Sequence, residues 1–153
     1  MARRRTRALA ESFVLDCSMA VAWFFEDETD RYSQAVEDSL PTATAIVPSL
    51  WPLEVANALL AGERRKRATE ATVTTFLGLL AALPITLDED TAGRAWPVSL
   101  QLARSHRLSV HDAAYLELAM RKRLPLATLD DKLAAAAAAA GVAAYNPGPR
   151  DKG

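Results

Sequence analysis

Four carboxylates from distant parts of the chain are the residues best suited to chemistry. Asp16 ends the apolar run "FVLD", Glu54 lies in "LWPLEVANALL" and Asp112 lies in "LSVHDAAYLELA". Asp130 directly follows the run "PLATL". Clustered carboxylates repel one another, and a divalent cation such as Mg²⁺ or Mn²⁺ removes this cost. Such a cation can activate water against a phosphodiester, so the acids, if they meet, favour metal-dependent phosphodiester hydrolysis.

Other ligand types are scarce in the sequence. Cys17 is the single cysteine, and the two histidines are His106 and His111. A structural zinc site usually needs several thiolate or imidazole ligands, so this composition argues against one. An internal disulfide is impossible with one cysteine, which fits a reducing compartment. His111, beside Asp112, is predicted to be a surface residue at a helix start rather than a ligand.

Short apolar runs alternate with helical segments along the whole chain. This alternation predicts an α/β fold, in which helices cover both faces of a small, mostly parallel sheet of four or five strands. The predicted strands are residues 13–16, 43–48, 84–87 and 125–129, with a weak fifth strand in "VAAYN", 142–146. The predicted helices run from about 18 to 27, 29 to 39, 49 to 62, 69 to 83, 90 to 106, 109 to 123 and 131 to 140.

The predicted elements place the acids at one edge of the sheet. In open parallel sheets, ligands bind beyond the carboxyl ends of the strands. Asp16 ends the first strand, and Asp130 lies just past the fourth. Glu54 lies in the helix after the second strand, and Asp112 begins the helix before the fourth. We therefore expect the four carboxylates to meet there.

Each acid also has a purely structural explanation. Asp16 could cap the first helix in place of Ser18, the predicted N-cap. Glu54 could be a solvated residue of an amphipathic helix, although apolar residues surround it in the sequence. Asp112 lies three residues after Ser109 and could complete a capping box. Asp130 could be an N-cap, so it is the joint placement of the acids, not any single one, that favours function.

The four motifs together resemble a known family. The order of "FVLDCS", "PLEVANAL", "SVHDAAYLELA" and "LPLATLDDKL" resembles the PIN-domain nucleases, most closely the VapC toxins of bacterial toxin–antitoxin pairs. The resemblance covers about residues 13–145. It implies a PIN-like three-layer α/β/α sandwich and an endoribonuclease that depends on Mg²⁺ or Mn²⁺. It also implies inhibition by a cognate VapB-like antitoxin, and homodimerisation.

The resemblance also assigns roles to individual residues. It makes Asp16, Glu54, Asp112 and Asp130 the metal-binding and catalytic acids. Supporting positions are Ser18 near the first acid, Asn57 one turn after Glu54, and Thr128 before the last acid. Asp131 is an additional acid, and the T-x-D spacing favours Asp130 over it as the fourth member.

Basic residues gather in short clusters although the net charge is only −1. An acidic pocket repels RNA unless cations flank it, so these clusters are candidates for phosphate binding. They also lie at predicted helix C-termini, where cations offset the helix dipole, and that alternative stays open. The candidate substrate-binding residues are Arg64, Arg65, Lys66, Arg67, Arg121, Lys122 and Arg123.

The sequence predicts one domain with short tails. We expect a flexible basic tail over 1–11, the PIN-like domain over 12–146 and a C-terminal tail over 147–153. The N-terminus fails as a signal peptide because Glu11, Ser12 and Asp16 interrupt its apolar stretch. No apolar run approaches the roughly 20 residues of a membrane helix. We therefore expect a cytoplasmic protein with no membrane partner.

Two other functions compete with the nuclease. An aspartyl-phosphate enzyme would need a second Asp where Ser18 stands, and Lys132 is poorly placed for a phospho-acceptor site. The stronger alternative is a PIN-like module that binds RNA or protein without cutting. The presence of all four acids argues against such a degenerate site.

Overall fold

The structure is a computed structural model, and it describes residues 11–148. Four short parallel strands form the centre of the fold. Strand β1 (Ser12–Leu15) lies between β2 (Thr44–Val47) and β4 (Leu126–Ala127), and β3 (Ile85–Leu87) pairs with β2 at the edge. All three pairings are parallel. The α/β fold with a parallel sheet is therefore confirmed.

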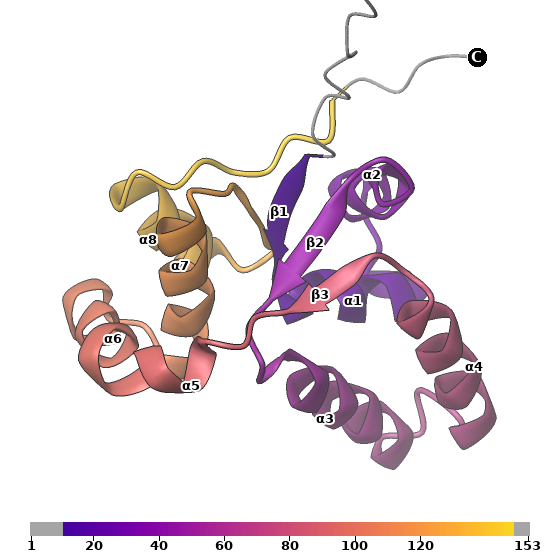
Figure 1. The fold of residues 1–153 in the computed structure, drawn as a ribbon. Helices are drawn as coiled ribbons and strands as arrows, with labels where there is room; N and C mark the ends of the chain where they lie inside the picture. The colour runs from indigo at the N-terminus through magenta and orange to yellow at the C-terminus, as the bar shows by residue number, and fades with distance from the viewer. Residues whose placement is uncertain (1–10, 149–153) are drawn as a thin grey trace, which may run out of the picture.

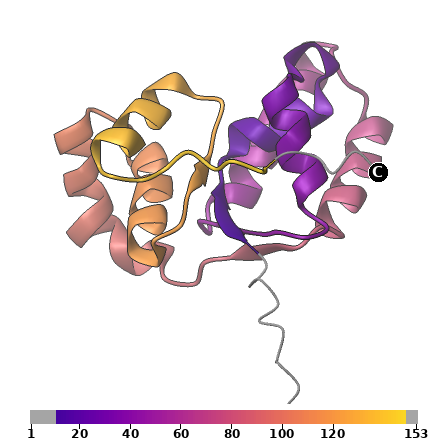
Figure 2. The same cartoon turned by 90° about the horizontal axis from the view of Figure 1, so that it is seen from above.

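Helices cover both sides of this sheet. Helices α1 to α4 lie on one side and α5 to α8 on the other, so the fold has three layers (Figures 1 and 2). The helices are α1 (Cys17–Phe24), α2 (Arg31–Ser39), α3 (Trp51–Arg64), α4 (Glu70–Ala81), α5 (Thr91–Arg94), α6 (Leu100–His106), α7 (Val110–Lys122) and α8 (Asp131–Ala139). A 3-10 turn, η1 (Glu26–Glu28), follows α1, and a π-helical segment, η2 (Ala95–Ser99), joins α5 to α6.

The core lies where the helices meet the central strand. Phe13, Val14 and Leu15 of β1 are all fully buried, as expected for a parallel strand that is covered on both faces. In α7, every residue from Ala113 to Ala119 is buried. The apolar run "FVL" therefore reflects burial on both faces, and it delivers Asp16 to the end of the central strand.

The start of the first helix differs from the sequence prediction. Ser18 is not the N-cap, because α1 begins at Cys17 and Asp16 occupies the N-cap position. The Asp16 side chain makes no capping hydrogen bond; instead it accepts a hydrogen bond from Ser18. Asp16 is thus at a cap position by backbone geometry, while its carboxylate is used elsewhere.

Two other predicted elements are modified. The helix predicted over 90–106 is divided by the π-helical turn that contains Pro97, a residue without the N–H that an α-helix needs. The fifth strand predicted over 142–146 is wrong: its pairing is an isolated parallel bridge between Leu126 and Ala144. β4 spans two residues, and Pro147 lacks the N–H that would extend the pairing.

The predicted tails fall almost wholly on residues 1–10 and 149–153, which lie outside the described residues. Within residues 11–148, no helix has the length and apolar character required to span a bilayer.

Gly62 marks a close contact between α3 and the end of α1. A Cβ atom at this position would lie 2.5 Å from Cζ of Phe25. The Phe25 ring is packed edge-on against Phe24 and lies under the Arg67 guanidinium, so it has little room to move. We expect Gly62→Ala to lower the free energy of unfolding by about 1–3 kcal/mol, measured by urea denaturation.

Gly78 in α4 provides the matched control. No heavy atom lies within 4 Å of a Cβ placed there. Gly78→Ala should therefore raise the free energy of unfolding by roughly 0.5–1 kcal/mol through helix propensity alone. Equal effects of the two substitutions would contradict the close packing at Gly62.

Candidate functional site

Asp16 is a buried carboxylate held by two hydroxyl groups. Its side chain is 6% exposed, and its backbone N–H donates to the carbonyl of Ala127 in β4. Ser18 Oγ donates to Asp16 Oδ2 over 2.6 Å, and Thr128 Oγ1 donates to the same oxygen over 2.7 Å. Both hydroxyls use Oδ2, so Oδ1 accepts neither of these hydrogen bonds. The carboxylate is oriented before any ligand arrives.

The same hydroxyls organise the loop that carries the fourth acid. The backbone N–H of Leu129 donates to Ser18 Oγ, and that of Asp130 donates to Thr128 Oγ1, each over 3.0 Å. Asp130 Oδ1 accepts from the backbone N–H of Leu133, so Asp130 is the N-cap of α8. The capping explanation for Asp130 is therefore correct, and it occupies one of the two carboxylate oxygens.

Glu54 is held by a residue that the sequence analysis missed. It lies half-buried in the first turn of α3, and its Oε1 accepts a 2.5 Å hydrogen bond from the Tyr115 hydroxyl. Asn57, the predicted supporting residue, is exposed. The spacing in the sequence could have indicated this residue, because Tyr115 lies three residues after Asp112 and therefore on the same face of its helix.

Asp112 lies at the start of the same helix as Tyr115. Ser109 caps α7, and its Oγ accepts from the backbone N–H of Asp112 over 3.0 Å. The side chain of Asp112 is partly exposed. The neighbouring His111 is exposed, as predicted.

Asp16 lies within electrostatic range of the other three acids. Burial is the largest cause that raises the pKa of Asp16, and the charges of Asp112 and Asp130 raise it further against the hydrogen bonds from Ser18 and Thr128. Burial and the charge of Asp130 raise the pKa of Asp112. The carboxylates therefore share one negative field, which is the expected effect of like charges brought together.

Glu54 belongs to the same field. Burial raises its pKa most, the Tyr115 hydrogen bond lowers it, and the charges of Asp16 and Asp112 raise it. A positive charge on His111 would lower the pKa of both Glu54 and Asp112. Charge interactions thus link Asp16 and Asp112 with both Glu54 and Asp130, although these residues come from segments far apart in the sequence.

The donor set fits a hard divalent cation in an open site. Within residues 11–148, no group of three or more His, Cys, Asp or Glu side chains is placed so that it could hold a metal ion. Mg²⁺ does not require such a group, because it keeps several waters and binds through one or two carboxylates. Carboxylate oxygens such as those of the oriented Asp16 are the ligand type that such a cation takes, whereas zinc would find no thiolate or imidazole cluster.

The predicted substrate-binding cations lie at the other ends of the acid-bearing helices. Glu54 lies in the first turn of α3, and Arg64 ends this helix about 15 Å further along the axis, at about 1.5 Å per residue. Asp112 and Lys122 have the same relation on α7. Lys66 and Arg123 adopt positive φ angles just after these helices. The alternative interpretation, in which these cations lie at helix C-termini and offset the helix dipole, is therefore correct for their positions.

Two of these cations are already bound to carboxylates. Arg67 donates to both oxygens of Asp27 over 2.9 and 3.0 Å and lies 4.3 Å from the centre of the Phe25 ring. Arg121 forms paired hydrogen bonds with both Glu117 and Asp88. Contacts from Arg67 or Arg121 to RNA would have to replace these bonds.

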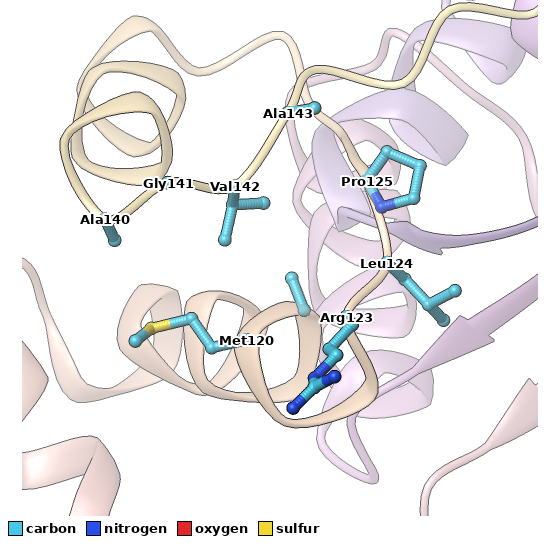
Figure 3. Close-up of a pocket in the computed structure, with 9 residues that line it drawn as sticks. Met120, Arg123, Leu124, Pro125, Ala140, Gly141, Val142 and Ala143 are labelled. Carbon is cyan, nitrogen blue, oxygen red and sulfur yellow. The ribbon is translucent and has the colours of Figure 1, made fainter.

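A shallow hollow elsewhere on the surface carries no acid. It lies between the C-terminal ends of α7 and α8, beside the start of β4 (Figure 3). Its lining is mainly apolar, with Met120, Leu124 and Val142 and a single charged residue, Arg123. The hollow is thus at the end of α7 opposite to Asp112 and is not part of the acidic site.

Comparisons with known proteins agree with the fold. The family model described as "PIN domain" matches residues 13–139. Among solved structures, the chain is similar to PAE2754 from Pyrobaculum aerophilum, with a TM-score of 0.62 and 21% sequence identity. That match covers 84% of this chain and 87% of the other. No curated protein sequence matches the chain.

Proposed function

Because this chain belongs to the PIN-domain family, whose members are generally metal-dependent nucleases, we propose that its acidic site hydrolyses RNA phosphodiester bonds. The observation that carries the proposal is the oriented, buried Asp16 in the shared field of Glu54, Asp112 and Asp130. Clustered carboxylates repel one another without a counter-cation, and Mg²⁺ or Mn²⁺ bound to their oxygens would remove this repulsion.

The residues of the chain then have distinct roles. Asp16, Glu54, Asp112 and Asp130 would hold Mg²⁺ or Mn²⁺. A bound cation of this kind supplies an activated water and charge stabilisation for the phosphodiester. Ser18 and Thr128 orient Asp16 through their hydroxyls, and the capping bond of Asp130 fixes the loop that carries it. Asp131 is placed in the first turn of α8, where its charge favours the helix dipole.

The biological role that we propose is that of a VapC-type toxin acting in the cytoplasm. A VapB-like antitoxin and a second copy of the chain are the proposed protein partners, and RNA is the proposed substrate. Exposed leucines on α3 and α4 support a protein-binding surface: Leu53, Leu60, Leu77 and Leu79. RNA extends beyond the cleaved bond, so the exposed Arg64, Arg65, Lys66, Lys122 and Arg123 are proposed as outer phosphate contacts.

Cleavage of RNA by the purified chain in Mn²⁺ or Mg²⁺ tests the function. We expect cleavage that EDTA abolishes, and an Asp130→Asn variant with at least tenfold lower activity, since Asn retains the helix cap but not the charge. Loss of one charge lowers affinity for the cation, which the dependence of rate on Mn²⁺ concentration would reveal.

Asp131→Asn is the matched control for this experiment, because it removes a charge from the adjacent residue of the same helix start. Its activity should stay within about twofold of the wild type if Asp130 is the fourth acid. A reversed order of the two variants would assign that role to Asp131. Metal-supplemented protein that binds RNA without cutting it would instead support the non-cleaving module.

A further inference from the structure

Tyr115 differs from the other tyrosines in the group that its hydroxyl contacts. The chain has three tyrosines. Tyr32 donates to the backbone carbonyl of Tyr145 over 2.7 Å, and the Tyr145 hydroxyl is 2.9 Å from Ser39 Oγ, so both hydroxyls have neutral partners. Tyr115 donates to the Glu54 carboxylate, over 2.5 Å. A buried tyrosine needs a hydrogen-bond partner, and here the partner belongs to the acidic site.

The bond joins two helices that each carry an acid of the site. Tyr115 is on α7 with Asp112, and Glu54 is on α3, 61 residues away in the sequence from Tyr115. The Tyr115 side chain is fully buried, so its hydroxyl has a fixed position, whereas Glu54 is only half-buried. A short O–H···O⁻ bond from a rigid donor therefore restrains a longer and more mobile side chain.

We propose that Tyr115 is a positioning residue, whose hydroxyl holds Glu54 at the acidic site for interaction with the hydrated divalent cation. This inference rests on the proposed function, because it concerns the same site. Groups that orient the carboxylates of a metal site typically contribute 10- to 100-fold to metal affinity or activity. The contribution of Tyr115 acts through Glu54 and not through contact with the substrate.

Tyr115→Phe tests the role, with Mn²⁺ binding to the RNA-free protein as the readout, measured by electron paramagnetic resonance of the free ion. We expect the dissociation constant to rise by about tenfold. Tyr32→Phe is the matched control: it also removes a tyrosine hydroxyl from a hydrogen bond, but one whose acceptor is the backbone carbonyl of Tyr145 and not an acid of the site. It should change Mn²⁺ affinity by less than twofold.

A double-mutant cycle separates positioning from a general structural effect. In a Glu54→Gln background, Tyr115→Phe should no longer change Mn²⁺ affinity if Tyr115 acts through the Glu54 carboxylate. An undiminished effect in that background would overturn the inference. Equal Mn²⁺ affinity of Tyr115→Phe and wild type would also overturn it.

A second measurement leaves Tyr115 unchanged and so does not depend on the folding of Tyr115→Phe. Addition of Mg²⁺ should alter the near-ultraviolet absorbance of a phenol bonded to a metal-binding carboxylate, and Glu54→Gln should abolish this change. No change in the wild type would count against the inference. Failure of the wild type to bind Mn²⁺ at all, or unaltered binding by Asp16→Asn, would instead refute the proposed metal-dependent function.

Discussion

Asp16→Asn is expected to reduce metal-dependent RNA cleavage by at least about 100-fold while leaving the fold intact. Outer groups of a metal site contribute 10- to 100-fold, so loss of the charge on a proposed ligand should exceed that range. Asp16 has both a fixed orientation and the central place, with hydroxyls from α1 and from the loop after β4 on one oxygen. Single-turnover cleavage at saturating enzyme measures the effect.

Without metal, Asp16→Asn should be as stable as the wild type or more stable, although its activity is lost. Burial raises the pKa of Asp16 in the folded state above its unfolded value, so ionised Asp16 disfavours folding once the pH exceeds the unfolded pKa. The amide of Asn keeps the volume and still accepts the Ser18 and Thr128 hydrogen bonds. Thermal unfolding at neutral pH should therefore show an equal or higher Tm for Asp16→Asn.

The joint result distinguishes a functional acid from a structural one. Lost activity with retained stability is the pattern of a residue kept for function at some cost to folding. A variant that keeps more than a tenth of wild-type cleavage would remove Asp16 from the site. A variant with a much lower Tm would show that the carboxylate has mainly a structural role.

Arg121→Met should lower the free energy of unfolding by about 3–5 kcal/mol, the usual effect of removing one partner from a buried ion pair. Arg121 Nε lies 2.7 Å from Glu117 Oε1, and its Nη2 lies 2.7 Å from Asp88 Oδ2. The Asp88 and Glu117 side chains are 3% and 4% exposed. Without the guanidinium, these two carboxylates would remain buried in α7 and the loop after β3.

Low pH should reduce this difference between Arg121→Met and wild type. Burial alone would raise the pKa of Asp88, but hydrogen bonds from Arg121 and Thr91 hold it below its usual value. The wild type therefore has the stabilisation above the unfolded pKa of Asp88 and loses it as the pH falls through the lower folded pKa. In Arg121→Met the carboxyl can protonate at low pH, so urea denaturation at neutral pH and near pH 3 should show a smaller difference at pH 3.

Lys122→Met is the matched control, since Lys122 is the next residue of α7 and is exposed. Surface substitutions of this kind usually change the free energy of unfolding by less than about 0.5 kcal/mol. Similar destabilisation by both variants would show that the loss comes from the helix C-terminus and not from the buried ion pairs. A free energy unchanged in Arg121→Met would contradict the network itself.

Local signals were sufficient to predict most elements and the edge that carries the acids. Fully buried parallel strands appear as short apolar runs, and "FVLD" therefore located both β1 and the acid at its end. Ser109 and Thr69 marked helix starts correctly, because capping depends on a hydrogen bond three residues away. The weak fifth strand failed because strand pairing depends on a partner elsewhere in the chain.

The sequence by itself determined which acids could meet, since strand order along the chain and the shared carboxyl edge of a parallel sheet decide that. Only the tertiary structure decided what holds them. The Ser18 and Thr128 hydroxyls meet on Asp16 across 110 residues, and Tyr115 reaches Glu54 across 61. Only the tertiary structure likewise showed the partners of Arg121. The sequence made it a candidate RNA contact, but in the fold it lies between two buried carboxylates. The physical reason is that a hydrogen bond depends on the final positions of two side chains, whereas apolar periodicity records only how each segment is buried.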